Sequence, residues 1–68
     1  MQPVASSNLS AVEYDSETKT LYIRFNSGST YAYSNVPESI YKGLMSALSK
    51  GGYHAAFIKN SFPYKRIG

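Results

Sequence analysis

The sequence predicts a small α+β domain, a three-stranded antiparallel β-meander followed by one or two helices that pack on one face of the sheet. Apolar side chains first recur with a period of two, over residues 9–14, 20–26 and 29–34, and then, after Pro37, with helical spacing. Helices that follow such a meander cover one face of its sheet. The chain has 68 residues, 43% of them apolar, which fits a single domain, residues 1–68.

The segment 20–26 has the clearest strand pattern. Its apolar residues occupy every second position: Leu21, Ile23 and Phe25. The segment 9–14 alternates in the same way, and residues 15–18 between the two have the composition of a turn. Arg24 is expected to be solvated or to pair with Glu13 across this first hairpin. Residues 1–7 are small and polar, and they are expected to fray.

The third segment, 29–34, carries Tyr31 and Tyr33, and the turn before it decides where they point. With a two-residue loop, these tyrosines would lie opposite Arg24 and Tyr22 on the face of the sheet away from the core. Three tyrosines and an arginine on one face would form a stacking platform, as used to bind single-stranded nucleic acid.

A three-residue loop with Gly28 in a left-handed bulge reverses this orientation. Tyr31 then lies opposite Ile23, Tyr33 lies opposite Leu21, and both tyrosines belong to the core. The sequence Asn-Ser-Gly suits this turn, and so small a core needs the aromatic area. The core register is therefore the favoured one.

Helical spacing begins after Pro37. Pro37 is expected at the first helical position, followed by Glu38, whose charge is favourable at the positive end of the helix dipole. The apolar stripe comprises Ile40, Tyr41, Leu44, Ala47 and Leu48. Gly43 within this stripe indicates close packing or a loose helix. Gly51-Gly52 is expected to end the helix, with Lys50 near its negative end.

A second short helix is expected over residues 53–60, since two apolar or aromatic pairs are spaced four apart: Tyr53 with Phe57, and His54 with Ile58. Pro63 is expected to stop regular structure. Beyond the helix, aromatic and apolar residues alternate with basic ones in a C-terminal tail that could pack back on the sheet: Phe62, Tyr64, Lys65, Arg66 and Ile67.

Positive charge is concentrated in the second half of the chain. Residues 1–38 hold four acidic and two basic residues, a sum of −2. Residues 39–68 hold five basic residues and no acid, a sum of +5: Lys42, Lys50, Lys59, Lys65 and Arg66. This pattern indicates either a surface for a polyanion or a solvated helix face.

The composition argues against several classes of site. The chain has no cysteine and one histidine, which excludes disulfides, cysteine zinc sites and three-histidine metal sites, so neither a metal nor a cofactor is expected. No serine lies in a nucleophile elbow, the acids of residues 13–17 bracket a turn, and Gly51-Gly52 lacks the Lys-Ser ending of a phosphate loop. We therefore expect a protein that is not an enzyme.

No apolar run approaches the length of a membrane span and no secretory signal is recognised, so a cytoplasmic location is expected.

The leading hypothesis is a small non-catalytic module that binds RNA. Phosphates would be contacted by Lys50, Lys59, Lys65 and Arg66, and bases or sugars would stack on Tyr53, His54 or Tyr64. Lys65-Arg66 beside Tyr64 is the strongest candidate, whereas His54 is as well explained as a surface or half-buried helix residue. Four phosphate contacts predict a slope of log K against log salt of about −3, at about 0.7 per contact.

The alternative is a protein-interaction module with no nucleic-acid ligand. The third strand would have a free edge, which can pair with another protein domain or with a second copy of the chain. In this interpretation the basic tail matches an acidic partner or only increases solubility.

An ordered string of residues adds a resemblance. It comprises Ser6-Ser7-Asn8-Leu9, Tyr14-Asp15, Tyr31-Ala32-Tyr33, Asn35-Val36-Pro37-Glu38-Ser39-Ile40-Tyr41, Ser49-Lys50-Gly51, Phe57-Ile58-Lys59 and Tyr64-Lys65-Arg66-Ile67. The string resembles the KTSC domain family, which is named after a C-terminal extension of some lysyl-tRNA synthetases and also occurs as short free-standing proteins of bacteria and phages. The family's central Tyr-x-Tyr motif matches Tyr31 and Tyr33. The resemblance brings no established activity with it. Its attachment to a synthetase suggests binding of RNA, tRNA included. Ala55 and Ala56 stand where the family often has an asparagine.

Overall fold

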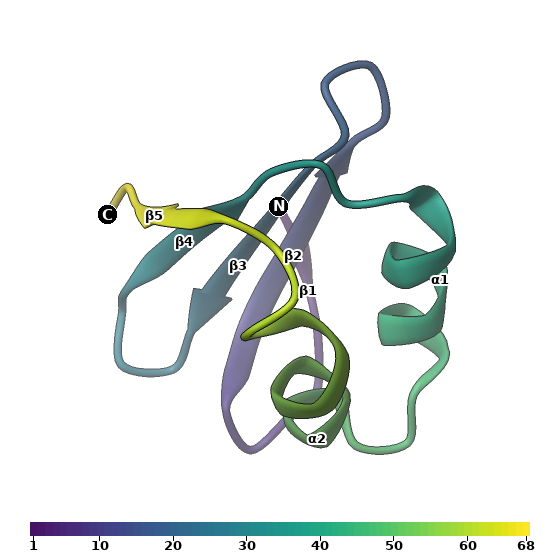
Figure 1. Ribbon diagram of the computed structural model, residues 1–68. Helices are drawn as coiled ribbons and strands as arrows, with labels where there is room; N and C mark the ends of the chain where they lie inside the picture. Colours follow the sequence, from purple (N-terminus) through teal and green to yellow (C-terminus); the bar gives the residue numbers. More distant parts are fainter.

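Five antiparallel strands form one sheet, and the helical segments lie together on one side of it (Figure 1). The computed structural model describes residues 1–68. The strands follow one another in the order β1 (Gln2–Pro3), β2 (Leu9–Asp15), β3 (Thr20–Phe25), β4 (Thr30–Tyr33) and β5 (Tyr64–Arg66). The predicted α+β class and the meander of β2, β3 and β4 are confirmed. The prediction of only three strands was wrong, because a short strand is added at each edge.

The two edge strands are too short for a period-two pattern to reveal them. Residues 1–7 were expected to fray, yet Gln2 and Pro3 pair with β2. Regular structure was expected to stop at Pro63, yet β5 follows it directly and pairs with β4. The free edge of the third strand, on which the protein-interaction alternative depended, is therefore covered. The new edges carry a proline on β1 and two cations on β5, features that oppose further strand pairing.

The favoured register of the second hairpin is confirmed. Tyr31 lies opposite Ile23, and Tyr33 lies opposite Leu21. Gly28 has φ of 97°, and its N–H donates to the Phe25 carbonyl at 2.9 Å, which closes the turn. Only glycine adopts this backbone conformation without strain. Tyr33 is 3% exposed and belongs to the core.

The predicted Arg24–Glu13 pair is not formed. In the first hairpin Glu13 lies opposite Tyr22, and Arg24 lies opposite Ala11. The Glu13 carboxylate instead lies 3.4 Å from the amino group of Met1, and Arg24 is exposed. The alternative expectation, a solvated Arg24, fits the structure.

The helical part is broken into three short pieces, α1 (Glu38–Ser46), α2 (Lys50–Tyr53) and η1 (His54–Ile58). Pro37 precedes the first helix with an extended ψ of 151°, so it is not the first helical residue, as was predicted. The first helix ends at Ser46, and Gly51-Gly52, expected to end it, lies inside α2.

The break has a local cause. The Ser49 hydroxyl accepts a hydrogen bond from the N–H of Gly52 at 3.1 Å and so caps a new helix, as serine does at helix N-termini. The Lys50 ammonium donates to the carbonyl of Ala47, just beyond α1, at 3.2 Å. Leu48 was predicted to belong to the apolar stripe, but it lies in the linker between the helices and is fully exposed, so this part of the prediction was wrong.

Gly43 marks a close contact between α1 and α2, one of the two explanations offered for it. A Cβ atom at this position would lie 2.7 Å from the ζ carbon of the Tyr53 ring and closer still to its hydroxyl. Tyr53 therefore fills the space that a side chain at residue 43 would need.

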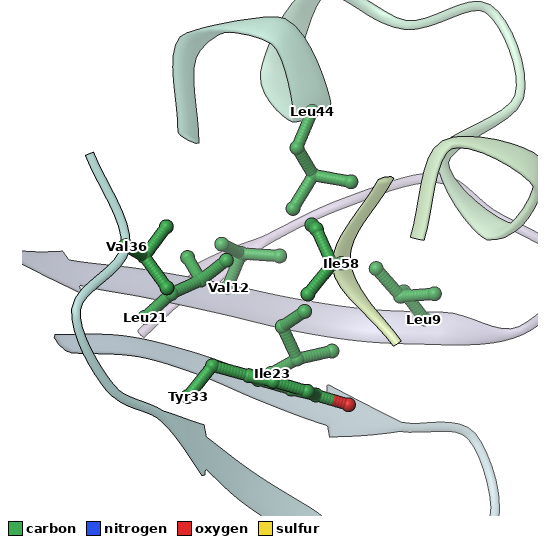
Figure 2. Close-up of a cluster of buried hydrophobic side chains, with 8 residues drawn as sticks. All are labelled: Leu9, Val12, Leu21, Ile23, Tyr33, Val36, Leu44 and Ile58. Atoms are coloured by element: carbon green, nitrogen blue, oxygen red, sulfur yellow. The ribbon is translucent and has the colours of Figure 1, made fainter. Parts of the chain in front are cut away.

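The core lies between the sheet and the helical pieces (Figure 2). Eight side chains form it: Leu9, Val12, Leu21, Ile23, Tyr33, Val36, Leu44 and Ile58. Leu44 comes from α1 and Ile58 from η1, and each is fully buried against the strands. Burying one such side chain contributes about 1.5–3 kcal/mol to folding, so these two residues hold the helices on the sheet. None of the helices has the length and hydropathy needed to cross a membrane.

Candidate functional site

The site begins with an unusual helical turn. The N–H of Lys59 donates to the carbonyl of His54 at 2.9 Å, a span of five residues rather than the four of an α-helix. His54 and Lys59, the two residues joined by this hydrogen bond, both line one cavity, whereas Ile58 between them is fully buried in the core. Turns of this kind are rare in proteins, and those that do occur often lie at functional sites.

His54 is joined to the sheet by its side chain. Its Nε2 lies 2.7 Å from the Tyr33 hydroxyl, and the imidazole is only 9% exposed. Burial, and then the nearby Lys59 cation, lower the pKa of His54. Burial, and then Tyr64 and Tyr31, raise the pKa of Tyr33 to about 12. Both groups are therefore neutral at pH 7.

His54 and four other rings form a closed circle, here called the aromatic pocket. Its members are Phe25, Tyr31, Tyr33, His54 and Tyr64. Each ring contacts two others, with centroids 5.1 to 5.7 Å apart. Residues from β3, β4, β5 and η1 contribute, so the pocket exists only when the sheet and η1 are assembled. The rings line an open cavity of about 530 Å³.

The remaining wall of the cavity is polar. Asn26 donates from its side-chain amide to the Ser7 carbonyl at 2.9 Å, which ties the segment before β2 to the rim. Asn8 in that segment packs against Gly51, where an added Cβ would lie only 2.8 Å from its Nδ2. Lys59 is the only lysine or arginine in the lining, and no carboxylate is present there.

Three of the seven predicted site residues meet in the cavity: His54, Lys59 and Tyr64. Tyr31 and Tyr33, the two tyrosines of the Tyr-x-Tyr motif, line it as well. His54 is buried in its floor rather than placed on the surface. The aromatic pocket thus unites residues that are up to 39 positions apart, from Phe25 to Tyr64.

The other four predicted residues lie elsewhere. Tyr53 packs against Gly43 and against Phe57, with ring centroids of the latter pair 4.8 Å apart. Lys50 is engaged with the carbonyl of Ala47. The expected common surface of all seven residues is therefore not formed.

Lys65 and Arg66, the strongest sequence-based candidates, point to opposite faces of the sheet because they are neighbours on one strand. Lys65 lies opposite Ala32, on the face away from the helices. Arg66 lies opposite Tyr31, on the face of the aromatic pocket, and its Nε donates to the carbonyl of Gly68 at 2.9 Å.

Sequence reasoning missed Phe25, Asn8 and Asn26 as parts of the site. Phe25 was counted only as the last apolar residue of a strand, and the two asparagines only as turn or end residues. The ordered string of residues that resembles the family does contain Asn8 and Gly51, and these two residues are in contact. The presence of both residues in that string was the only sequence feature that linked them, and it gave no information about the distance between them.

The lining suits a planar ligand with a negative charge. It offers aromatic faces, amide and hydroxyl groups, and one ammonium. Aromatic boxes also attract cations, but Lys59 and the absence of a carboxylate disfavour a cation here. No group of three residues able to hold a metal ion is present.

Comparison with known proteins gives concordant results. Lysine–tRNA ligase from Trichormus variabilis is 44% identical over 54 residues, which are 79% of this chain and 10% of the ligase. A protein from Tsukamurella paurometabola is 39% identical over 62 residues, covering 91% of this chain and 92% of its own length. The crystal structure of a KTSC domain protein from Yersinia pestis superimposes with a TM-score of 0.96 at 40% identity, covering 98% of this chain and 94% of that one.

The chain thus spans about a tenth of the length of the ligases it matches, but nearly the whole of the small relatives. The sequence model of the KTSC domain matches residues 5–62. The resemblance drawn from the ordered string of residues is confirmed, and the chain belongs to the KTSC domain family.

Proposed function

We propose that this domain is a non-catalytic module that binds RNA, with the aromatic pocket as the contact for a base and Lys59 as a contact for phosphate. The observation that carries the proposal is the closed circle of five rings, open to solvent, beside one cation and no carboxylate. Stacking on aromatic side chains contributes about 1–3 kcal/mol per base, and a neighbouring cation adds phosphate attraction.

The Tyr33–His54 pair supports a binding role over a catalytic one. A tyrosine whose pKa is raised to about 12 does not ionise near neutral pH, so it is no activated nucleophile. The hydrogen bond instead fixes two walls of the cavity relative to each other. The relatives named as lysine–tRNA ligases, in which this domain matches a tenth of the chain, favour tRNA as the class of ligand.

The placement of the cations revises the expected salt dependence. Lys59 lines the cavity and Arg66 lies on the same face of the sheet, whereas Lys65 lies on the other face. Two phosphate contacts predict a slope of log K against log salt of about −1.4, instead of about −3 for four.

Fluorescence anisotropy with a labelled single-stranded RNA, at four salt concentrations, tests the proposal. Lys59→Gln is expected to weaken binding and to make the slope shallower by about 0.7. Lys65→Gln is the matched control, since it removes the same charge from the opposite face, and it is expected to leave the slope unchanged. Absence of binding at millimolar protein, or equal effects of the two substitutions, would contradict the proposal.

A further inference from the structure

We infer that the aromatic pocket admits one unpaired nucleotide, its base among the rings and its phosphate at Lys59, so that the module selects an unstacked nucleotide in single-stranded RNA and rejects duplex. The inference rests on the proposed function and names the element of RNA that the site takes.

The relative orientation of the rings is the first support. Tyr31 and Tyr64 meet at 88°, Phe25 and Tyr31 at 70°, and Tyr33 and His54 at 74°. Rings that serve as a platform for successive bases present parallel faces along a sheet. Rings that are nearly perpendicular to one another instead surround a cavity, and such a cavity has room for one planar group rather than for a row of stacked bases.

The depth of the cavity is the second support. Its floor is formed by Tyr33 and His54, which are 3% and 9% exposed, and its rim by Tyr64, which is 58% exposed. Its volume of about 530 Å³ lies in the range of pockets that enclose one small ligand. A base inside a duplex has both faces covered by its neighbours, so it reaches such a floor only when it is unpaired and rotated out of the stack.

The hydrogen-bonding groups on the floor are the third support. Tyr33 occupies Nε2 of His54, and the other ring nitrogen, Nδ1, makes no hydrogen bond within the chain and is not sealed from solvent. Because His54 lines the cavity, its neutral imidazole has one nitrogen left to bond the edge of a base. In a duplex that edge is already paired.

The charge at the rim completes the match. Lys59 and His54 both line the cavity, and Lys59 is exposed whereas His54 is buried. A base inserted toward His54 keeps its own phosphate within reach of the mouth, where the lining holds no acidic group to oppose it. A neutral ring joined to one negative charge fits this distribution, whereas a cation or a plain hydrocarbon does not.

The experiment compares three ligands on the whole chain: a single-stranded RNA hexamer, the same hexamer with every base removed, and a hairpin duplex. The intact hexamer is expected to bind at least tenfold more tightly than the abasic hexamer and the duplex. Amide shifts in an NMR titration with the hexamer are expected to concentrate at residues 31–33, 54–59 and 64. AMP and UMP are expected to shift the same amides at millimolar concentration, and inorganic phosphate is not.

Tyr64→Ala tests the rim, because Tyr64 is exposed on an edge strand and its removal leaves the core in place. It is expected to weaken the hexamer about tenfold. Tyr22→Ala, on the opposite face of the sheet, is the control and is expected to change nothing.

The outcomes separate the inference from the proposed function. Equal binding of intact and abasic hexamers, equal binding of the duplex, or shifts that avoid the cavity would overturn the inference while RNA binding itself survives. Failure of all three ligands to bind would overturn both.

Discussion

The hydroxyl of Tyr33 lies 2.7 Å from Nε2 of His54, a buried hydrogen bond between residues 21 positions apart. It joins β4 to the start of η1 and forms the floor of the aromatic pocket. Because both side chains are largely buried, each is the polar partner that the other needs. One contact therefore connects stability, the ionisation of the pair and the shape of the candidate site.

Tyr33→Phe is expected to lower the free energy of unfolding by about 1–3 kcal/mol, because it leaves Nε2 of His54 without its partner. Urea unfolding followed by circular dichroism measures this. Tyr31→Phe is the matched control: the Tyr31 hydroxyl makes no hydrogen bond within the chain, and its removal is expected to change stability by less than about 0.5 kcal/mol. Equal losses in the two variants would contradict the role given to the Tyr33–His54 bond.

The lowered pKa of His54 predicts a dependence of stability on pH. Below the usual histidine pKa of about 6.5, His54 of the unfolded chain binds a proton, whereas the buried His54 of the folded chain stays neutral until the pH reaches its lowered pKa. Stability is therefore expected to be full above about pH 7.5 and to fall as the pH decreases toward the lowered pKa.

The groups that face His54 give this prediction its sign. Lys59 repels the imidazolium, the Tyr33 hydroxyl is neutral, and no carboxylate lines the cavity. Urea unfolding between pH 5.5 and 7.5 measures the slope, and His54→Gln is expected to remove it. A slope that persists in His54→Gln would assign the dependence to another group.

Gly43→Ala is expected to destabilise the domain by about 1 kcal/mol, because the cost of overpacking against the Tyr53 ring exceeds the gain of about 1 kcal/mol from replacing a helical glycine. Combined with Tyr53→Leu, the same substitution is expected to become stabilising, since the obstructing ring atoms are gone. Thermal or urea unfolding of the four proteins tests this reversal. A loss of the same size in both backgrounds would mean that Tyr53 is not the cause.

Ser49→Ala is expected to cost about 1 kcal/mol, because the Ser49 hydroxyl caps α2 through the N–H of Gly52. Since α2 continues into η1, loss of the cap is also expected to reduce the protection of the His54 and Lys59 amides in hydrogen exchange. Ser46→Ala, at an exposed position of α1, serves as the comparison and is expected to be close to neutral. Protection lost equally in both variants would argue against a capping role.

The register of the second hairpin shows how far local sequence reaches. Asn26-Ser27-Gly28 predicts a bulged turn, and this turn alone decides that Tyr31 and Tyr33 face the helices. The break between α1 and α2 shows the limit of such reasoning. The apolar spacing continues through Leu48, which predicts one uninterrupted helix. The Ser49 cap and the contact of Tyr53 with Gly43 divide it instead. The Tyr53–Gly43 contact joins two separate helices, so no local sequence pattern predicts it.

By itself the sequence determined the class of the fold, the three central strands, the inward orientation of the two motif tyrosines and the membership of a family, because these depend on periodicity, turn chemistry and an ordered string of residue types. Only the tertiary structure decided where the site lies. The edge strand β5 brings Tyr64 beside Tyr33, η1 brings His54 and Lys59 into the lining of one cavity, and strand alternation separates Lys65 from Arg66. Each of these depends on which backbone groups find a hydrogen-bonding partner after the chain has folded, and a linear pattern does not carry that information.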